Sequence, residues 1–362
     1  MEEEWKSVVN AIIKLSKYTI FTALIAITSM VILIGTLFNN QSTNSSPIVT
    51  EENTRPINHM TAKTISAASP SSDLNKTNWK SPDISSMPSG KDGRIIRYGR
   101  ELIAHTANYF GPNGSVAQIS NGMNCQNCHL DGGTRTFANN FAGFISSYPK
   151  MSGRSGKVEP ATERISECFQ RSLSGKTPDT SGKEIQAMLA YMKWLGRGVK
   201  KGMQLYGSAT EKLPFMDVAA DPVKGKVVFI AKCQSCHGNN GQGWLEASKK
   251  SYAYPPLWGN HSYNDGAGMY RVANLAGFVK NNMPYGATYQ NPLLTNADAW
   301  NVAAFINSQL RPHMDQHKDW TDLKRKPIDS PFGPYADRFS ERQHKYGPFK
   351  PIKNARNPQA TN

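Results

Sequence analysis

The 362-residue chain has few apolar residues, few acidic residues and only five cysteines. Hydrophobic residues make up only 38% of it, which excludes a membrane protein with several spans. Lys and Arg outnumber Asp and Glu by 42 to 27, and the net charge of +15 favours anionic partners. The basic residues form no dense run interleaved with aromatic residues, so we expect no nucleic-acid partner.

One long apolar run extends from Tyr18 to Phe38, contains no charged residue and follows Lys6, Lys14 and Lys17. It has the length of one membrane-spanning helix and exceeds the roughly 7 to 15 residues of a signal-peptide core. Because lysines precede the run, we expect the N-terminus in the cytoplasm and the remainder outside it. Residues 1–40 are therefore predicted to be an inner-membrane anchor or an uncleaved signal, and the body is predicted to lie in a bacterial periplasm.

Two similar halves follow a linker. Residues 41–90 are rich in Ser, Thr, Asn and Pro, which is typical of a flexible tether. Each half then has a Cys-x-x-Cys-His motif, a loop-rich middle and a closing amphipathic helix, so we expect two domains of the same type, residues 91–212 and 213–312. Residues 313–362 contain too many aromatic residues for a solvated segment and are predicted to be an extended tail packed on the body.

The predicted fold is mostly α-helical, with little strand. Ser181 and Asp221 are expected as N-caps, the first for the helix that closes the first half and the second for the helix that opens the second half. Pro222 directly after Asp221 suits the first helical position.

Both Cys-x-x-Cys-His motifs are attachment sites for haem c. The residues are Cys125, Cys128 and His129 in the first half and Cys233, Cys236 and His237 in the second. Two cysteines three positions apart can form thioethers to both haem vinyl groups, and the adjacent histidine then lies under the iron as its proximal ligand. A redox cysteine pair or a zinc knuckle is the rival interpretation, but two copies in an exported chain disfavour both. The sequence thus predicts two cytochrome c-like domains, each with one covalently bound haem c.

The second haem iron needs a distal ligand, and Met283 in KNNMPYG is the favoured candidate. It stands in a loop before the last helix, as far downstream as expected in a small cytochrome c. Methionine opposite histidine raises the reduction potential, which suits a haem from which electrons leave. Met269 is the competitor, although methionines more often fill cores.

The residues leave the distal ligand of the first haem open, because no Met-Pro pair stands at the matching place. The candidates are Cys168, His105, Met151 and Met188. A lone helix histidine is usually structural, and Met188 lies on an apolar helical stripe. Cys168 is the one cysteine outside the motifs, and a free thiol in an oxidising compartment is expected to be buried or used. Arg164 and Arg171 should lower its pKa and favour the thiolate.

Three segments carry a resemblance to a known family. They are MNCQNCHLDGG, SGRSGKVEPATERISECFQRSLSGK and PFGPYADRF with the later QHKYGPF. Over roughly Gly93 to Ile352 the sequence resembles the dihaem thiosulfate dehydrogenases, also called tetrathionate synthases. The segment around Cys168 is the most specific part of the resemblance.

The resemblance implies an enzyme that couples two thiosulfate ions to tetrathionate and passes two electrons to a soluble cytochrome c or similar acceptor. It implies that Cys168 is the distal ligand of the first, catalytic haem. Arg154, Arg164 and Ser172 would line the substrate pocket, and Met283 would be the distal ligand of the second haem. Some relatives carry a competing lysine just before this methionine; Asn282 stands there, so we expect no ligand switch.

A mechanism follows as a hypothesis. Two thiosulfate dianions repel each other, and the guanidinium groups of Arg154 and Arg164 would offset that repulsion, with Ser172 as a neutral donor. Cys168 could leave the iron and carry a sulfur adduct, which would split the coupling into two steps. The same site could reduce tetrathionate, and the haem potentials would decide the direction.

Two other function classes remain open. One is a cysteine-ligated haem subunit of the multi-enzyme sulfur-oxidation system, which the second haem and Met283 disfavour. The other is a membrane-tethered dihaem electron carrier without a substrate of its own, which would not need arginines beside a thiolate ligand. A dihaem peroxidase is a weaker third possibility, since nothing beyond the haem motifs resembles one.

Overall fold

The computed structural model describes residues 5, 14–16, 18, 77–248 and 250–356. The chain divides into two units, Met1–Ala68 and Ser69–Asn362, and the fold below is that of the second unit. Among the described residues, no helix is long and apolar enough to cross a membrane. The expected span, residues 18–38, lies outside the described residues except for Tyr18, and so does most of the expected linker.

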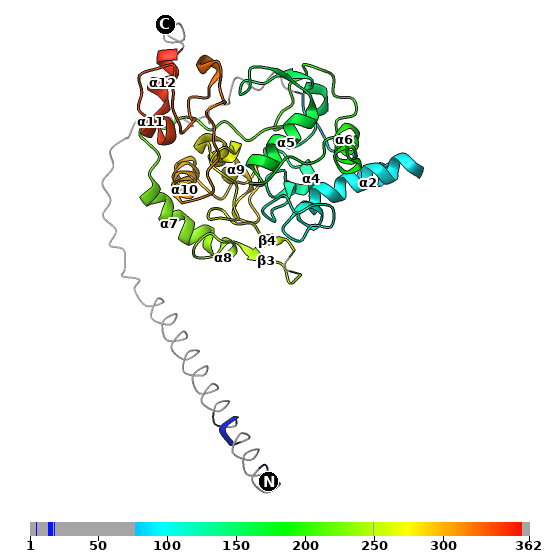
Figure 1. The fold of residues 1–362 in the computed structure, drawn as a ribbon. Coiled ribbons are helices and arrows are strands. Elements are labelled where there is room, and N and C mark those ends of the chain that lie inside the picture. Colours follow the sequence, from blue (N-terminus) through cyan, green and yellow to red (C-terminus); the bar gives the residue numbers. More distant parts are fainter. Residues whose placement is uncertain (1–4, 6–13, 17, 19–76, 249, 357–362) are drawn as a thin grey trace, which may run out of the picture. The chain divides into compact units, whose positions relative to one another are not determined.

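The first half of the body consists of helices joined by long loops (Figure 1). Its helices and strands are α2 (Gly90–Ala104), α3 (Thr106–Phe110), α4 (Leu130–Gly133), β1 (Lys150–Met151), β2 (Val158–Glu159), α5 (Ala161–Arg171) and α6 (Lys183–Leu195). Short 3-10 turns lie at Ile84–Ser86, Cys125–Asn127 and Ile145–Ser147. The first and last long helices, α2 and α6, pack against each other.

The second half repeats this plan. Its elements are α7 (Pro222–Lys232), α8 (Gln234–His237), β3 (Trp244–Leu245), β4 (Tyr252–Tyr254), a 3-10 turn at Gly268–Tyr270, α9 (Val272–Asn282) and α10 (Asn296–Ser308). Here α7 packs against α10, which also contacts α9. The strands of the described residues form two antiparallel pairs of two or three residues, so the prediction of a mostly helical fold is confirmed.

A glycine allows the close helix crossing in each half. A Cβ atom on Gly99 of α2 would lie 1.9 Å from the backbone oxygen of Ala187 in α6. A Cβ atom on Gly225 of α7 would lie 1.9 Å from the backbone oxygen of Asn301 in α10. Since any larger side chain would push the helices apart, both crossings depend on glycine at these positions.

The two expected N-caps have different outcomes. The Asp221 carboxylate accepts hydrogen bonds from the backbone N–H groups of Val223 and Lys224, as predicted for the start of α7. Ser181 is not the cap of α6, because Gly182 precedes its first residue. The Ser181 hydroxyl donates instead to the Asp179 carboxylate at 2.7 Å. This local turn competes with capping, as short polar side chains often do.

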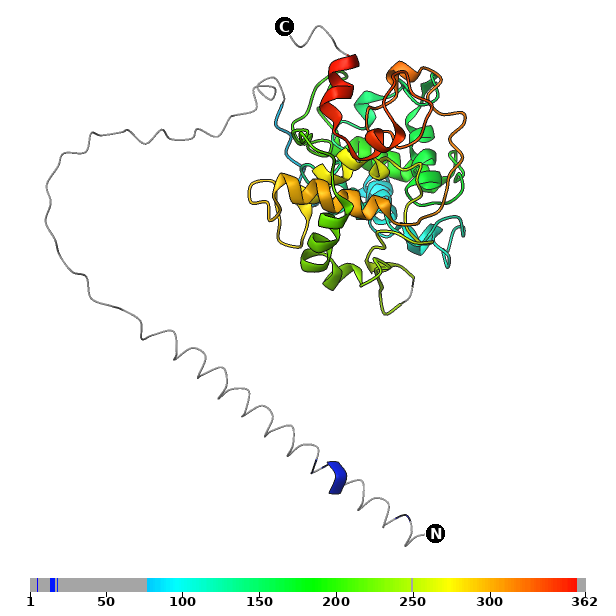
Figure 2. The ribbon, with the colours of Figure 1, turned by 90° about the vertical axis from the view of Figure 1, so that its left-hand side faces the viewer.

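The C-terminal tail is not wholly extended, contrary to the expectation. It forms a 3-10 turn at Leu323–Arg325 and two helices, α11 (Glu341–Tyr346) and α12 (Phe349–Arg356). The Ser340 hydroxyl caps α11 by accepting from the backbone N–H of Gln343. In α12, Phe349 and Ile352 are buried in the apolar core of the second half, which explains why this segment is ordered. Figure 2 shows both helices against the body.

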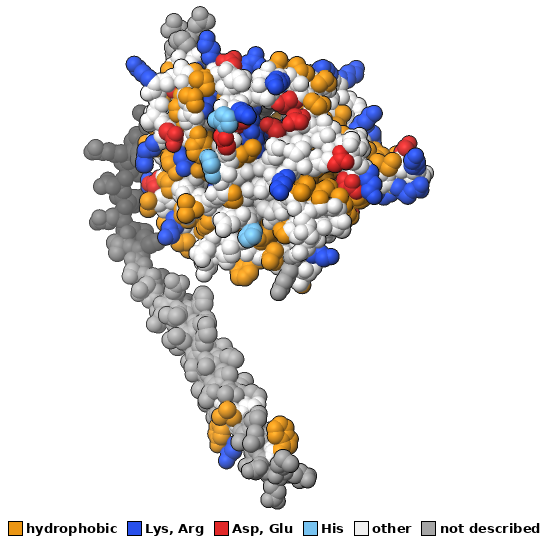
Figure 3. All heavy atoms as spheres, in the orientation of Figure 1, with side chains coloured by type: hydrophobic (Ala, Val, Ile, Leu, Met, Phe, Trp, Pro, Cys, Tyr) orange, Lys and Arg blue, Asp and Glu red, His pale blue; other side chains and the backbone are white. Residues whose placement is uncertain are grey.

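Basic side chains are spread over the face of the body shown in Figure 3, with acidic side chains among them. They do not form one continuous basic surface on that face. On this face the basic residues are thus distributed and do not mark a single binding surface.

Candidate active site

A cavity of about 390 Å³ lies beside the first haem motif. Cys125, Cys128 and His129 line it, and so do Arg164 and Cys168 from α5 and Ser172 directly after that helix. The structure therefore brings together one complete haem motif, the implied distal ligand Cys168, and two of the three residues that the resemblance implies for the substrate pocket, Arg164 and Ser172. The Gly268–Tyr270 turn and Asn274 of the second half also line it, so both halves build this cavity.

His129 is prepared to bind a metal through one ring nitrogen. Its Nδ1 lies 2.5 Å from the backbone oxygen of Asn139. A carbonyl oxygen can only accept, so Nδ1 carries the proton and Nε2 keeps its lone pair. The ring stacks on Phe141, with centroids 4.4 Å apart. Burial lowers the pKa of His129 to about 4, which keeps the imidazole neutral, as a metal ligand must be.

The four candidates for the distal side of the first haem are placed differently. Cys168 and Met188 line the cavity, and Met188 is also fully buried on α6. His105 lies at the end of α2, 3.9 Å from the Glu101 carboxylate, and does not line the cavity. Met151 is 49% exposed on β1. Of the four candidates, Cys168 and Met188 therefore remain, and of these two only the cysteine can also act as a nucleophile.

The rest of the first cavity fits a haem. A haem needs apolar contacts for its two faces, and the apolar side chains that line the cavity are Phe141, Phe144, Ile165, Phe169, Leu173 and Met192, among others. These apolar side chains would contact the faces of the haem. Cys125 and Cys128 would attach it, and the neutral His129 and the sulfur of Cys168 or Met188 are suitable ligands for its iron, so the cavity fits haem c.

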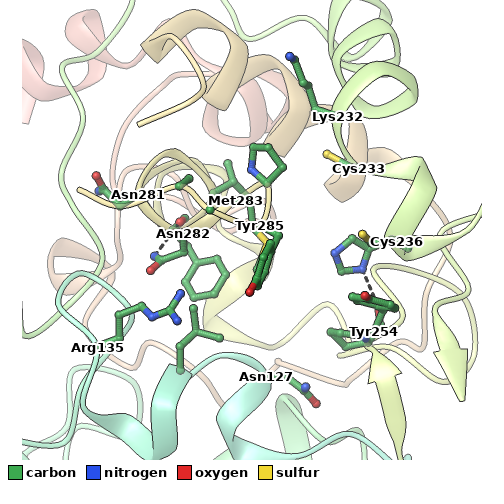
Figure 4. A pocket seen from close by; sticks show the side chains of 18 of the residues that line it. Asn127, Arg135, Lys232, Cys233, Cys236, Tyr254, Asn281, Asn282, Met283 and Tyr285 are labelled. Carbon is green, nitrogen blue, oxygen red and sulfur yellow. Dashed lines mark hydrogen bonds between the residues drawn. The ribbon is translucent and has the colours of Figure 1, made fainter. Parts of the chain in front are cut away.

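A second cavity, of about 670 Å³, lies beside the second haem motif. Cys233, Cys236 and His237 line it together with Met283, the first residue after α9. Figure 4 shows Cys233 and Cys236 on one side of the cavity and Met283 on the other. Met269 lines the first cavity instead, so the two methionines considered for the second haem are separated by the fold.

His237 resembles His129 in its environment. Its Nδ1 lies 2.9 Å from the backbone oxygen of Pro255, which leaves Nε2 available for a metal. Burial lowers the pKa of His237. The apolar side chains of Leu257, Leu275, Phe278, Val279 and Ile306 also line this cavity, and the set fits a second haem c.

One stretch of backbone separates the two cavities. Cys125, Cys128 and His129 line the first cavity, whereas Asn127 and Leu130 from the same stretch line the second. The haem motif of the first half is thus also part of the wall of the second cavity.

The two arginines implied by the resemblance differ in position. Arg164 lines the first cavity, and the nearby Cys168 sulfur raises the pKa of its guanidinium. Arg154 is not among the described residues that line this cavity. Its Nη1 lies 3.1 Å from one oxygen of Glu167, and Nη1 of Arg164 lies 2.5 Å from the other oxygen. Glu167 thus connects Arg154 to Arg164, directly beside Cys168.

The C-terminal tail completes this charged cluster. Asp319 lies 3.2 Å from Nε of Arg154 and 2.9 Å from Nη2 of Arg171. The guanidinium of Arg154 lies over the ring of Trp320, 5.5 Å from its centroid. Arg171, expected to influence Cys168, instead pairs with Asp319 and donates to the backbone oxygen of Gly266. The sequence analysis missed Glu167 and Asp319. The position of Glu167 directly before Cys168 was a signal for the first, but no local signal pointed to Asp319, which lies 148 residues from Arg171 in the sequence.

Comparison with known proteins supports a cytochrome c domain in each half. A profile described as "SoxA/TsdA, cytochrome c domain" matches residues 115–200, and one described as "Cytochrome c" matches residues 222–309. The chain is 36% identical to the thiosulfate dehydrogenase of Stutzerimonas stutzeri, over 65% of this chain and 73% of that protein. It is 37% identical to the thiosulfate dehydrogenase of Allochromatium vinosum, over 64% of this chain and 83% of that protein.

A solved structure is also similar. Thiosulfate dehydrogenase (TsdBA) from Marichromatium purpuratum matches with a TM-score of 0.61 and 32% identity, over 68% of this chain. This chain spans about half, 52%, of that solved chain. The chain has two cytochrome c domains, each with a haem motif in a suitable cavity, and it is similar to these relatives over most of its body. It therefore belongs to the thiosulfate dehydrogenase family.

Proposed function

We propose that the chain oxidises two thiosulfate ions to one tetrathionate ion in the first cavity. The observation that carries this proposal is the convergence of Cys168 and Arg164 with a haem motif in one cavity. An electron carrier would need the haem motif but not the other two residues. The names and the coverage of the relatives give independent support.

The reaction forms one sulfur–sulfur bond between the two terminal sulfur atoms. Two ions of charge −2 give one ion of charge −2 and release two electrons. The haems, when bound, supply the acceptor for these electrons. His129 and Cys168 would hold the first haem, and His237 and Met283 would hold the second.

We assign the coupling to Cys168 as the nucleophile. Its thiolate would bond to the terminal sulfur of the first thiosulfate, with loss of two electrons, and give a cysteine S-thiosulfonate. The second thiosulfate would attack the sulfur next to the cysteine, so that tetrathionate leaves and the thiolate returns. Atoms and charge balance in both steps, and each step joins only two partners.

The charged residues would bind and orient the substrate. Arg164 would contact the sulfonate oxygens through charge-assisted hydrogen bonds, and Ser172 would add a hydroxyl donor. Arg154 would act one layer further out, through Glu167, by fixing the orientation of Arg164. In this proposal Arg154 is a positioning residue.

The remaining assignments concern the cellular setting. We propose a periplasmic body, residues 91–312 with the tail, tethered to the inner membrane by residues 18–38. A soluble cytochrome c or similar protein would accept the electrons near the second cavity, where Tyr285 is 95% exposed.

The test is turnover by the purified full chain with both haems attached. Thiosulfate as the only electron donor should reduce ferricyanide rapidly, and tetrathionate should form at one ion per two electrons. Intact haems without turnover in either direction, including tetrathionate reduction, would instead favour the electron carrier.

A further inference from the structure

We propose that Lys150 is a further thiosulfate-binding residue of the first cavity, in addition to Arg164. This inference rests on the proposed function and deepens it, because it identifies the group that provides charge for the second of the two anions. Lys150 stands in β1, the first strand of the hairpin that precedes α5, and no motif in the sequence singles it out.

The lining of the cavity is the first reason. Lys150 lines it together with Arg164 and Cys168. Among the described residues, no Asp or Glu lines this cavity. A site with two cations and no carboxylate in its wall is suited to anions of high charge.

The charge balance behind the wall is the second reason. Three guanidinium groups, those of Arg154, Arg164 and Arg171, share the carboxylates of Glu167 and Asp319. Three positive and two negative charges leave a single positive charge for the whole cluster. Since two thiosulfate ions bring four negative charges, the cluster alone is a weak counterion for the pair.

Lys150 has its own charge available. It forms no ion pair with any described residue, although Glu159 stands opposite it across the β1–β2 hairpin. The Glu159 carboxylate instead accepts a hydrogen bond from the Ser155 hydroxyl. The Lys150 ammonium lies 5.1 Å from the ring centroid of Tyr148, which also lines the cavity. This contact can hold the side chain near the cavity without neutralising it.

Because Lys150 is exposed, its contribution is expected in binding more than in the chemical step. Lys150→Gln should raise KM for thiosulfate about 10-fold at low salt, the lower end for a hydrogen bond to a charged group. The value of kcat should stay within about twofold, since substrate bound at saturation still meets Cys168 and Arg164. The effect on KM should shrink at high salt, because exposed charges are screened.

The matched control is Lys157, an exposed lysine in the loop of the same hairpin that does not line the cavity. Lys157→Gln removes the same charge and should leave KM unchanged. Lys150→Arg keeps the charge and should restore most of the affinity. An equal rise of KM in both Gln variants would overturn the proposal, because it would indicate only the overall charge of the surface.

A second measurement separates binding from turnover. Calorimetric titration of the full chain with thiosulfate, with both haems reduced so that no turnover occurs, should give weaker binding for Lys150→Gln than for the wild type. Unchanged binding would refute the assignment. Wild-type binding that depends on Lys150, but without turnover in the oxidised protein, would leave this inference standing and refute the proposed function.

Discussion

The first and second domains share a scaffold but differ in the walls of their cavities. In both, a glycine permits a close helix crossing, at Gly99 and at Gly225. In both, the motif histidine has Nδ1 next to a backbone oxygen and Nε2 available. These shared features concern attachment of the haem and do not distinguish a catalytic site from an electron-transfer site.

The difference lies in the residues that are expected as distal ligands. Cys168 belongs to the last turn of α5, and Arg164, four positions earlier on the same helix, lines the same cavity. Met283 follows the end of α9, and the loop after it is uncharged. An expected ligand within a helix has neighbours at fixed spacing on the same side of that helix, here Arg164, whereas an expected ligand in a loop does not. The comparison teaches that two domains with a common scaffold can differ in the charge around their cavities, because Cys168 lies within a helix and Met283 lies after one.

The largest expected effect is the loss of Cys168. Cys168→Ala should lower kcat for thiosulfate by at least about a thousandfold, since removal of a nucleophile stops the covalent route. Ferricyanide reduction by the haem-loaded full chain measures this. Met188→Leu, a change of similar volume in the same cavity, should keep most of the activity. Near-normal turnover in Cys168→Ala would mean that Cys168 does not give the first domain a chemistry that the second domain lacks.

Next in size is the effect of Asp319 on stability. Asp319→Asn leaves Arg154 and Arg171 mostly buried with one carboxylate fewer, and should lower the free energy of unfolding by about 3 kcal/mol. Denaturant titration would measure the change. The matched control is Asp322→Asn, in a pair with Arg325 in which both side chains are more than half exposed. Its cost should stay below about 0.5 kcal/mol, and equal costs would argue against a stabilising role for the cluster.

Arg164 and Arg135 compare the two cavities directly, because each lines one of them. Arg164→Gln should lower kcat/KM about 30-fold, as expected for the loss of one charge-assisted contact. Arg135→Gln, in which Asp131 loses its partner at 2.7 Å, should change kcat/KM by less than about threefold. Steady-state kinetics with thiosulfate gives kcat/KM for both variants, and the two losses can be compared directly. A larger loss at Arg135 would place the anion site in the second cavity.

The smallest expected effect is a pH dependence where the tail leaves the second domain. The His313 ring lies 2.7 Å from the Asp265 carboxylate, and this hydrogen bond raises the pKa of His313. The stabilisation is therefore fully present below the unfolded pKa of about 6.5 and is lost as pH rises through the raised folded value. Because the ring is 74% exposed, the size should be only about 0.5 kcal/mol.

The difference in unfolding free energy between wild type and His313→Gln measures this term, since the other titrating groups cancel. It should shrink as pH rises from about 5.5 to 8. A difference that does not change with pH would mean that the contact works equally well with a neutral histidine.

The sequence allowed much of this to be predicted where the signal is local. The haem motifs, the helix start at Asp221 and the mostly helical fold depend on residues a few positions apart, so spacing alone indicates them. The cap expected at Ser181 was wrong for an equally local reason, since Asp179 takes its hydroxyl. The tail helices were missed because tertiary burial of Phe349 and Ile352 stabilises them.

Only the tertiary structure decided how the charged residues are divided among roles. Arg154, Arg164, Arg171 and Lys150 are all basic residues near Cys168 in the sequence, and nothing local separates them. Their roles depend on which carboxylates reach them, and Asp319 comes to Arg171 from 148 residues away. The sequence by itself determined that two haems and one additional cysteine would be present, because covalent attachment needs only a short motif. The fold decided which cations line the first cavity, because ion pairing depends on distance in space.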